Sequence, residues 1–366
     1  MNAEERILTA LRGGQPDRVP VLVYLNPYVD DWYSHLPSYA EVLSAAREYA
    51  DVVFNWDFPC PLMFTAAHPW IEQRDLGNGQ TEHVIHTPDG PITEVARVGW
   101  HGPEVVKRWI ASTEDAHRAL SMPYVPCKPD LETFFSTKAR LGDRAVAQAT
   151  FPEPLGVADW IDEQLLAAWC LRCRDLIREL LDTAFERIRD GLRTCLEAGM
   201  GPIYALRSRQ SALLKHLSPA DLEELIVPYD RPLVELIHRY EETYVTLQNQ
   251  GRISSLLDPL RTLGLDGLEV VDPPLSGERS LAYLKARIGR HVCLIANLPY
   301  DELNSRSPAE IERLVCQTLA AGAPGGGFML NPCPVAPERD LPGQASSNLI
   351  HYFRTAYHHG RYPLSA

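Results

Sequence analysis

The sequence predicts a (β/α)8 barrel, in which eight parallel strands alternate with helices. Eight short runs rich in β-branched and aliphatic residues recur between longer amphipathic segments. Most of these runs are apolar on both faces, which is typical of strands covered by helices on one side and by a packed interior on the other. No glycine-rich dinucleotide loop follows any run, which favours the closed barrel over an open doubly wound sheet. The predicted strands are Val19–Tyr24, Asp51–Trp56, Ala145–Thr150, Pro202–Leu206, Tyr244–Gln248, Gly267–Val271, His291–Ala296 and Gly327–Leu330.

Helices are predicted in the segments between these strands. Tyr39–Tyr49 precedes the second strand, and Trp160–Leu196 is a long amphipathic stretch that predicts two helices. Ser218 and Ser307 are each followed by proline and have an acidic residue three positions later, which is typical of a helix start. The first of these helices is expected to run toward Tyr229.

The segment Arg74–Arg108 predicts a β-hairpin inserted after the second strand. Its centre, Thr87-Pro88-Asp89-Gly90, has the residues of a tight turn. The 30 prolines do not cluster into a linker, and the chain has no low-complexity tract or long repeat. We therefore expect residues 1–366 to form one domain.

Charge and composition exclude several classes of protein. The 366 residues include 35 Lys and Arg against 48 Asp and Glu, a net charge of −13. Such a balance argues against nucleic-acid binding and against binding to anionic membranes. Met1–Arg12 resembles the start of an amphipathic helix and not a signal peptide, and no apolar run approaches the roughly 20 residues of a transmembrane helix. Eight scattered cysteines are typical of reduced thiols, so we expect a cytoplasmic protein that binds a small molecule.

Polar residues follow most of the predicted strands. In a (β/α)8 barrel the active site forms where the carboxyl ends of the strands converge, so these residues are the candidates for a site. Cys333 follows the last strand and completes the set. The candidates are Asn26, Tyr28, Asp57, Glu153, Arg207, Arg209, Gln248, Gln250, Glu269, Asp272, Asn297, Asn331 and Cys333.

Two arginines and two acids among these candidates suggest specific chemistry. Arg207 and Arg209 are suited to hold a carboxylate by paired hydrogen bonds. Asp57 and Glu153 have apolar neighbours that can raise a carboxyl pKa, so they are candidate acids or bases. An internal cluster of salt bridges among the same four residues is the alternative. Glu269 lies inside a strand, and we expect it to be a buried structural carboxylate.

Other chemical motifs are weak or missing. Cys170 and Cys173 have metal-like spacing, but they lie in a predicted helix without a second pair, which argues against zinc. Gly325-Gly326-Gly327 precedes a strand, so it predicts a turn and not a phosphate loop. The chain has no GxSxG, HExxH or Walker sequence.

The order of short motifs along nearly the whole chain resembles the uroporphyrinogen decarboxylase superfamily, which also contains corrinoid-linked methyltransferases. The resemblance implies the same barrel and a homodimer. The matching segments are Glu5 to Gly13, Pro16 to Pro20, Ser218-Pro219 through Pro228-Tyr229, the strand ending at Gly251, Gly264-Leu265-Asp266 with Glu269 through Pro273-Pro274, Gly277, Asn297-Leu298, Phe328 to Cys333, and Asn348 to Tyr362-Pro363.

The chain departs from both branches of this superfamily. Its methyltransferases carry a His-x-Cys pair and a later Cys that bind zinc; the corresponding residues are Gln248, Gln250 and Cys333. Amide oxygens are poor zinc ligands, so we expect no metal and no other cofactor. Its porphyrinogen decarboxylases carry an arginine-containing segment after the first strand, which here reads Tyr24-Leu25-Asn26-Pro27-Tyr28. Their catalytic aspartate is matched closely by Asp57. The resemblance therefore implies that the aspartate is present, whereas the arginine that binds the acidic side chains of uroporphyrinogen is missing.

Three functions follow from these residues and this resemblance. The first is a metal-independent lyase that decarboxylates a small carboxylic acid other than uroporphyrinogen. Its expected catalytic residues are Asp57, Glu153, Arg207 and Arg209, and its expected substrate-binding residues are Asn26, Tyr28, Gln248, Gln250, Asn297 and Cys333. The second is a methyltransferase that works with a corrinoid protein or another methyl carrier and has zinc in a rebuilt site. The third is a barrel that binds a small molecule without catalysis.

Overall fold

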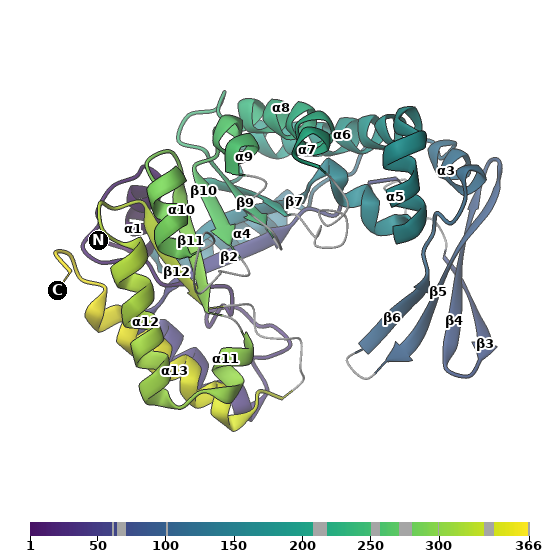
Figure 1. Cartoon of the computed structure of the whole chain (residues 1–366). Helices are drawn as coiled ribbons and strands as arrows, with labels where there is room; N and C mark the ends of the chain where they lie inside the picture. Colours follow the sequence, from purple (N-terminus) through teal and green to yellow (C-terminus); the bar gives the residue numbers. More distant parts are fainter. Residues whose placement is uncertain are drawn as a thin grey trace.

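The computed structural model of the chain describes residues 1–60, 62–63, 71–99, 102–207, 218–249, 257–270, 280–298, 300–332 and 340–364. Eight parallel strands form one sheet in the order β1-β2-β7-β8-β9-β10-β11-β12. A parallel bridge between Val21 and Leu330 joins its first and last strands, so the sheet closes into a barrel (Figure 1). The strands are β1 (Leu22–Val23), β2 (Asp51–Asp57), β7 (Ala145–Pro152), β8 (Ile203–Arg207), β9 (Tyr244–Asn249), β10 (Gly267–Val270), β11 (Cys293–Leu298) and β12 (Phe328–Pro332).

All eight predicted strands are confirmed, and helices cover the outside of the barrel between them. Short 3-10 turns, η1 (Pro37–Tyr39), η2 (Gly142–Arg144) and η3 (Pro154–Trp160), lie in the connections. The helices are α1 (Ala3–Leu11), α2 (Ala40–Tyr49), α3 (Thr113–Leu120), α4 (Leu131–Leu141), α5 (Glu163–Arg172), α6 (Arg174–Glu197), α7 (Pro219–Leu225), α8 (Val227–Ile237), α9 (Leu257–Leu263), α10 (Leu281–Ile288), α11 (Tyr300–Ser305), α12 (Pro308–Gly322) and α13 (Gly343–His359).

The predicted helix starts are confirmed, with one difference in length. The long stretch Trp160–Leu196 forms two helices, α5 and α6, as predicted. Ser307 and Glu310 form a capping box at the start of α12. The helix that begins after Ser218 ends at Leu225, and Tyr229 belongs to the separate helix α8. Pro228 lies in the first turn of α8, a position that proline favours, which fits the start of a separate helix here.

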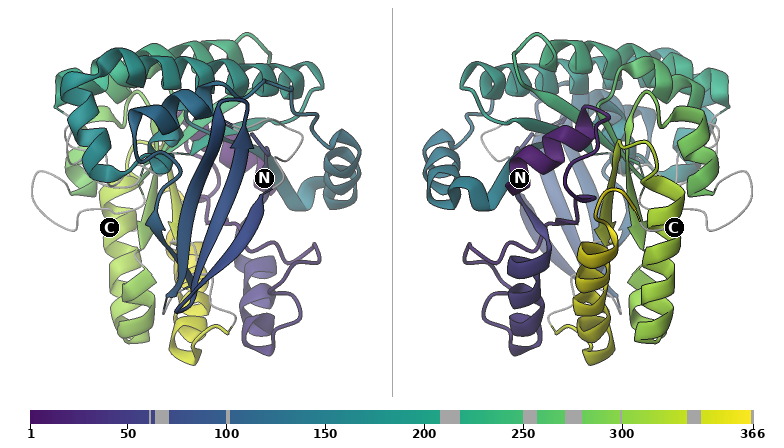
Figure 2. Two further views of the ribbon diagram at one scale, coloured as in Figure 1. Left: turned by 90° about the vertical axis from the view of Figure 1, so that its right-hand side faces the viewer. Right: turned by 90° about the vertical axis from the view of Figure 1, so that its left-hand side faces the viewer.

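The predicted insertion after β2 is present, but the predicted number of strands was wrong, because the insertion has four strands and a hairpin has two. It is a four-stranded antiparallel sheet in the order β3 (Glu72–Gly77), β4 (Gln80–Thr87), β5 (Gly90–Gly99) and β6 (Gly102–Lys107). The predicted turn at Thr87–Gly90 does join β4 to β5. The outer strand β3 is mostly polar and exposed, so it lacks the apolar alternation that predicts a strand. In Figure 1 this sheet stands apart from the barrel strands, beyond α3 and α5, and in the left view of Figure 2 it lies in front of the barrel.

Helix α1 closes the amino end of the barrel. Its side chains Ile7, Ala10 and Leu11 are buried against interior residues of the strands. At Gly267 an added Cβ would lie 2.9 Å from the Leu11 Cδ2 atom, which shows how closely α1 packs against β10. The amino end of the barrel is therefore filled by α1.

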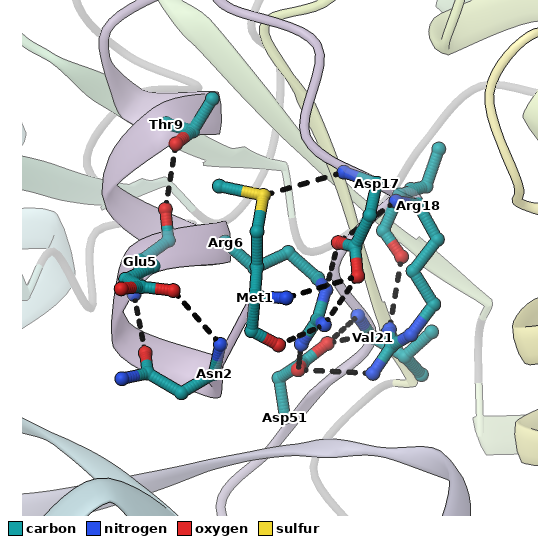
Figure 3. Close-up of polar contacts among 10 residues, drawn as sticks. Met1, Asn2, Glu5, Arg6, Thr9, Asp17, Arg18, Val21 and Asp51 are labelled. Atoms are coloured by element: carbon teal, nitrogen blue, oxygen red, sulfur yellow. Dashed lines mark hydrogen bonds and ion pairs between the residues drawn. The ribbon is translucent and has the colours of Figure 1, made fainter.

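A buried ion cluster fixes the first residue of β2 at the same end (Figure 3). The carboxylate of Asp51, which is 1% exposed, accepts hydrogen bonds from Arg6 at 2.6 Å and from Arg18 at 2.7 Å. It also accepts one from the backbone N–H of Val21 at 2.9 Å. The cluster therefore ties α1, the approach to β1 and the start of β2 together. No helix in the described part of the chain is long and apolar enough to cross a membrane.

Candidate functional site

Residues that face the barrel interior change from apolar to polar along each strand. Side chains alternate between the two faces of a strand, so every second residue points inward. On β2 the inward series is Val53, Asn55 and Asp57, and the first of these packs against α1 in the apolar layer. The polar residues therefore gather at the carboxyl ends, as predicted. The corresponding series are Leu22, Tyr24 and Asn26; Val146, Gln148 and Thr150; Ile203, Ala205 and Arg207; Tyr244, Thr246 and Gln248; Gly267 and Glu269; and Met329 and Asn331.

Asp57 and Arg207 form an ion pair at this end of the barrel. The Arg207 Nη1 atom lies 3.3 Å from Asp57 Oδ1, and Asn55 Nδ2 donates a hydrogen bond to the same oxygen at 3.0 Å. The Asp57 side chain is 65% exposed and that of Arg207 is 32% exposed. The pair is therefore accessible to a ligand, and Arg207 has the geometry to exchange Asp57 for the carboxylate of a substrate.

Arg207, Gln248 and Glu269 lie side by side on three neighbouring strands. The register pairs Arg207 with Gln248 and Gln248 with Glu269. Glu269 is 5% exposed; its Oε1 atom accepts a hydrogen bond from Asn331 Nδ2 at 2.5 Å, and its Oε2 atom accepts one from the Tyr24 hydroxyl at 3.4 Å. The row places a cation, an amide and a carboxyl group in one layer above the apolar interior.

Burial raises the pKa of the Glu269 carboxyl above its usual value. Hydrogen bonds from Gln248, Asn331 and Tyr24 and the charge of Arg207 oppose this effect without cancelling it. Burial also raises the pKa of Tyr24 well above its usual value, and the charge of Glu269 adds to the rise. Burial therefore favours the neutral form of each of the two side chains. The expectation of a buried Glu269 is confirmed, but its contact with Tyr24 also places it directly behind the site.

Asn26 offers an unused hydrogen-bond donor to the same space. The residue is 3% exposed, and its Oδ1 atom accepts from the backbone N–H of Tyr28 at 3.0 Å. Its Nδ2 atom is buried and has no hydrogen-bond partner among the described residues. A buried amide without a partner is costly, so this donor is suited to meet an acceptor on a ligand.

Tyr24 and three further polar residues of the site, Asn55, Gln148 and Thr150, were not predicted from the sequence. Thr150 Oγ1 donates to Asn55 Oδ1 at 2.5 Å, and Gln148 Nε2 donates to the same oxygen at 3.0 Å. These contacts leave Asn55 Nδ2 free to hold Asp57 in place. The signal was present in the sequence as a polar residue at every second position before each strand end, but only the strand register shows that they meet.

The polar residues line a cavity of about 690 Å³, which is within the usual size of ligand sites. Tyr24, Asn26, Asn55, Asp57, Arg207 and Gln248 all contribute to its walls. The structure thus brings together four of the predicted site residues, namely Asn26, Asp57, Arg207 and Gln248.

Other predicted site residues lie elsewhere or outside the described part. Tyr28 lines neither this cavity nor its neighbour beside Asp57, and the guanidinium of Arg144 lies over its ring at 5.2 Å. Glu153 is 2% exposed and lines neither cavity; its backbone N–H donates to the carbonyl of Arg207 at 3.3 Å. Arg209, Gln250, Asp272 and Cys333 are outside the described residues, as is the side chain of Asn297.

The described donors do not fit the zinc site that the resemblance implies. Gln248 occupies the first ligand position, and its neighbours are a carboxyl group and amides, whereas zinc in proteins prefers thiolate and imidazole. Within the described ranges no group of three or more His, Cys, Asp or Glu residues is placed to hold a metal ion. We therefore derive no chemical step through zinc.

Comparisons with known proteins place this barrel in a family. A methyltransferase from Methanosarcina mazei aligns with a TM-score of 0.60 and 17% sequence identity over 97% of this chain and 98% of its own, which shows a common fold. A B12-independent methionine synthase from Shewanella sp. W3-18-1 aligns with a TM-score of 0.34 and 11% identity over 77% of this chain and 75% of its own. No functionally curated protein matches the chain. The family model for uroporphyrinogen decarboxylase (URO-D) matches residues 155–341, more than half of the sequence, and the chain therefore belongs to this family.

Proposed function

We propose that the protein is a lyase that replaces the carboxylate of a small organic acid with a proton, and that its substrate is not uroporphyrinogen. The family and the fold are those of enzymes of the decarboxylase or methyltransferase type. The observation that carries the proposal is the accessible Arg207–Asp57 pair in one cavity with Tyr24, whose hydroxyl donates a hydrogen bond to the buried Glu269.

Arg207 binds the substrate in this proposal. Its guanidinium receives the carboxylate, and the Asn26 and Gln248 amides contact those polar groups of the substrate that reach the larger cavity. The carboxylate loses its charge as carbon dioxide leaves, so the ion pair with Arg207 stabilises the bound substrate more than the transition state. Lowering of the barrier must therefore come from other residues.

Tyr24 and Asp57 supply the chemistry. Tyr24 donates its proton to the carbon that bears the carboxylate, and Asp57 stabilises the positive charge that this creates on the substrate. The bond between that carbon and the carboxylate then breaks, its electron pair neutralises the substrate, and carbon dioxide leaves. Burial makes a free phenolate costly, so the proton that Tyr24 gives up is replaced from water through the Glu269 carboxyl group, which the Tyr24 hydroxyl contacts.

The test is a search for carbon dioxide release from a panel of small carboxylic acids in D2O. The expected product carries one deuterium at the carbon that lost the carboxylate, seen by NMR. Asp57→Asn should abolish turnover while the fold and substrate binding persist, and Tyr24→Phe should slow it at least a hundredfold. If Asp57→Asn turned over substrate as fast as the original protein, Asp57 would not be the residue that stabilises the positive charge on the substrate.

Methyl transfer is the second candidate, favoured by the alignment of the M. mazei methyltransferase over nearly the full length of both chains. A corrinoid protein or another methyl carrier would then be the partner. Methylation of reduced cobalamin, followed by its absorption spectrum, would detect this activity directly. About one zinc per chain in protein purified without chelators would support this candidate and count against the metal-independent lyase.

A further inference from the structure

A second cavity, of about 390 Å³, opens on the other side of the Arg207–Asp57 pair. Both residues also line the larger cavity, so the ion pair forms a wall common to the two. The rest of the lining differs strongly from the polar larger cavity, because aromatic and aliphatic groups dominate it. Those that matter here are Phe58, Leu62, Pro152, Gly156 and Trp160.

The aromatic wall of this cavity is rigid. The Phe58 ring stacks on the fully buried Phe151 ring, with centroids 4.9 Å apart and an angle of 23° between the planes. Behind Phe58 the backbone of Gly191 is so close that an added Cβ would lie 2.4 Å from the ring. Phe58 is 5% exposed and is held in place, so the part of it that lines the cavity is a fixed apolar wall that a ligand meets without loss of side-chain freedom.

We propose that this cavity binds the ring of an aromatic carboxylic acid whose carboxylate reaches Arg207. The inference rests on the proposed function, which assigns Arg207 to a carboxylate. An apolar cavity of about 150 Å³ accepts benzene, so the space here suffices for one or two rings. Arg207 is the one basic residue among the described lining, and the acidic Asp57 and Asp159 repel a carboxylate, so Arg207 is the group of this lining that can hold one.

The position of the ring in this cavity also indicates which kind of ring can react. A ring in this cavity brings the carbon next to its carboxylate close to both Arg207 and Asp57, which lie on the common wall. Protonation of that ring carbon gives a delocalised cation, and Asp57 is placed to stabilise it. The structure therefore favours an electron-rich ring as the substrate class.

Binding measurements on the whole protein test this assignment without the need for turnover. Calorimetry would compare benzoate with cyclohexanecarboxylate, benzamide and acetate. We expect benzoate to bind about threefold to tenfold more tightly than cyclohexanecarboxylate because a cavity wall with aromatic side chains favours an aromatic ring over a saturated one. Benzamide and acetate should bind at least tenfold more weakly than benzoate, because the first lacks the charge and the second lacks the ring.

Gly156→Leu is the variant that fills the cavity, and Gly343→Leu is its matched control. Gly156 lies in the lining, where an added Cβ would be 3.3 Å from the flexible Leu62 side chain. Gly343 is exposed, with nothing within 4 Å of an added Cβ. Gly156→Leu should weaken benzoate more than tenfold and leave acetate unchanged, and the control should change neither. Trp160→Ala provides a second test if Gly156→Leu fails to fold, and should also weaken benzoate selectively.

The outcomes separate this inference from the proposed function. Benzoate binding no more tightly than acetate, or unaffected by both cavity variants, would overturn the aromatic assignment and leave the carboxylate lyase intact. Benzamide binding as tightly as benzoate would overturn the role of Arg207, and with it both the inference and the proposed mechanism.

Discussion

Arg207 Nη1 and Asp57 Oδ1 lie 3.3 Å apart on a wall that two cavities of opposite character have in common. Asp57 ends β2 and Arg207 ends β8, with β7 between them in the sheet. The pair thus links a polar space and an aromatic space across three strands. A ligand that replaces Asp57 at Arg207 would have access to both.

Arg207 should be needed for carboxylate binding through its fork of donors and not only its charge. Arg207→Met should weaken benzoate binding about tenfold to a hundredfold, as expected for loss of hydrogen bonds to a charged group. Arg207→Lys should recover only part of this, because one ammonium cannot replace two parallel N–H groups. Calorimetry at one salt concentration would measure the benzoate affinity of both variants. A lysine variant that binds benzoate as tightly as the original protein would show that Arg207 contributes only its charge.

Asp51 should contribute to stability without affecting the site. Asp51→Asn leaves the buried Arg6 and Arg18 without their carboxylate, which typically costs about 3–5 kcal/mol of unfolding free energy. Asp17→Asn is the control, since Asp17 also pairs with Arg6 but is 45% exposed and should cost less than about 1 kcal/mol. Urea unfolding would measure both. Equal losses from the two variants would contradict the importance of burial.

Asp230 should destabilise the protein at neutral pH. It is 2% exposed, its Oδ2 atom has no partner among the described residues, and burial raises its pKa from 3.8 to about 7. The folded state therefore binds this proton more tightly than the unfolded state, and stability falls as pH rises from about 4 to about 7. Asp230→Asn should add on the order of 1–4 kcal/mol at pH 8 and little at pH 4.

Urea unfolding at the two pH values would measure this change. Glu235→Gln, on the exposed side of the same helix, is the control and should be neutral at both. An Asp230→Asn variant with equal effects at pH 4 and pH 8 would show that the charge of Asp230 is not responsible.

His238 should have the opposite pH dependence. Its Nε2 atom lies 2.8 Å from Asp266 Oδ2, and this hydrogen bond raises the pKa of the imidazole. The stabilisation is complete below the ordinary pKa near 6.5 and is lost as pH rises through the raised value. Because the side chain is 35% exposed, His238→Gln should cost only about 0.5–1 kcal/mol at pH 5.5 and less at pH 9. Thermal unfolding at both values would check this, and a loss that grows with pH would contradict it.

The sequence by itself determined the barrel, because strand and helix formation depend on local patterns. Apolar runs gave all eight strands, and serine-proline starts gave α7 and α12. It also determined that polar residues end the strands, and Asn26, Asp57, Arg207 and Gln248 among them line one cavity; their roles stay a prediction. The size of the insertion was not predictable in this way, since β3 has no apolar alternation and forms only by pairing with β4. That the chain is one domain, cytoplasmic and dimeric stays a prediction.

The tertiary structure alone decided which polar groups meet and which of them reach a ligand. Glu153 and Asp57 look equivalent in sequence, yet Glu153 is buried away from both cavities while Asp57 lines both. Glu269 and Tyr24 become a pair only because barrel closure brings the first strand within reach of β10. The physical reason is that burial and register are set by contacts between residues far apart in the chain, and these contacts in turn set pKa values and access to solvent.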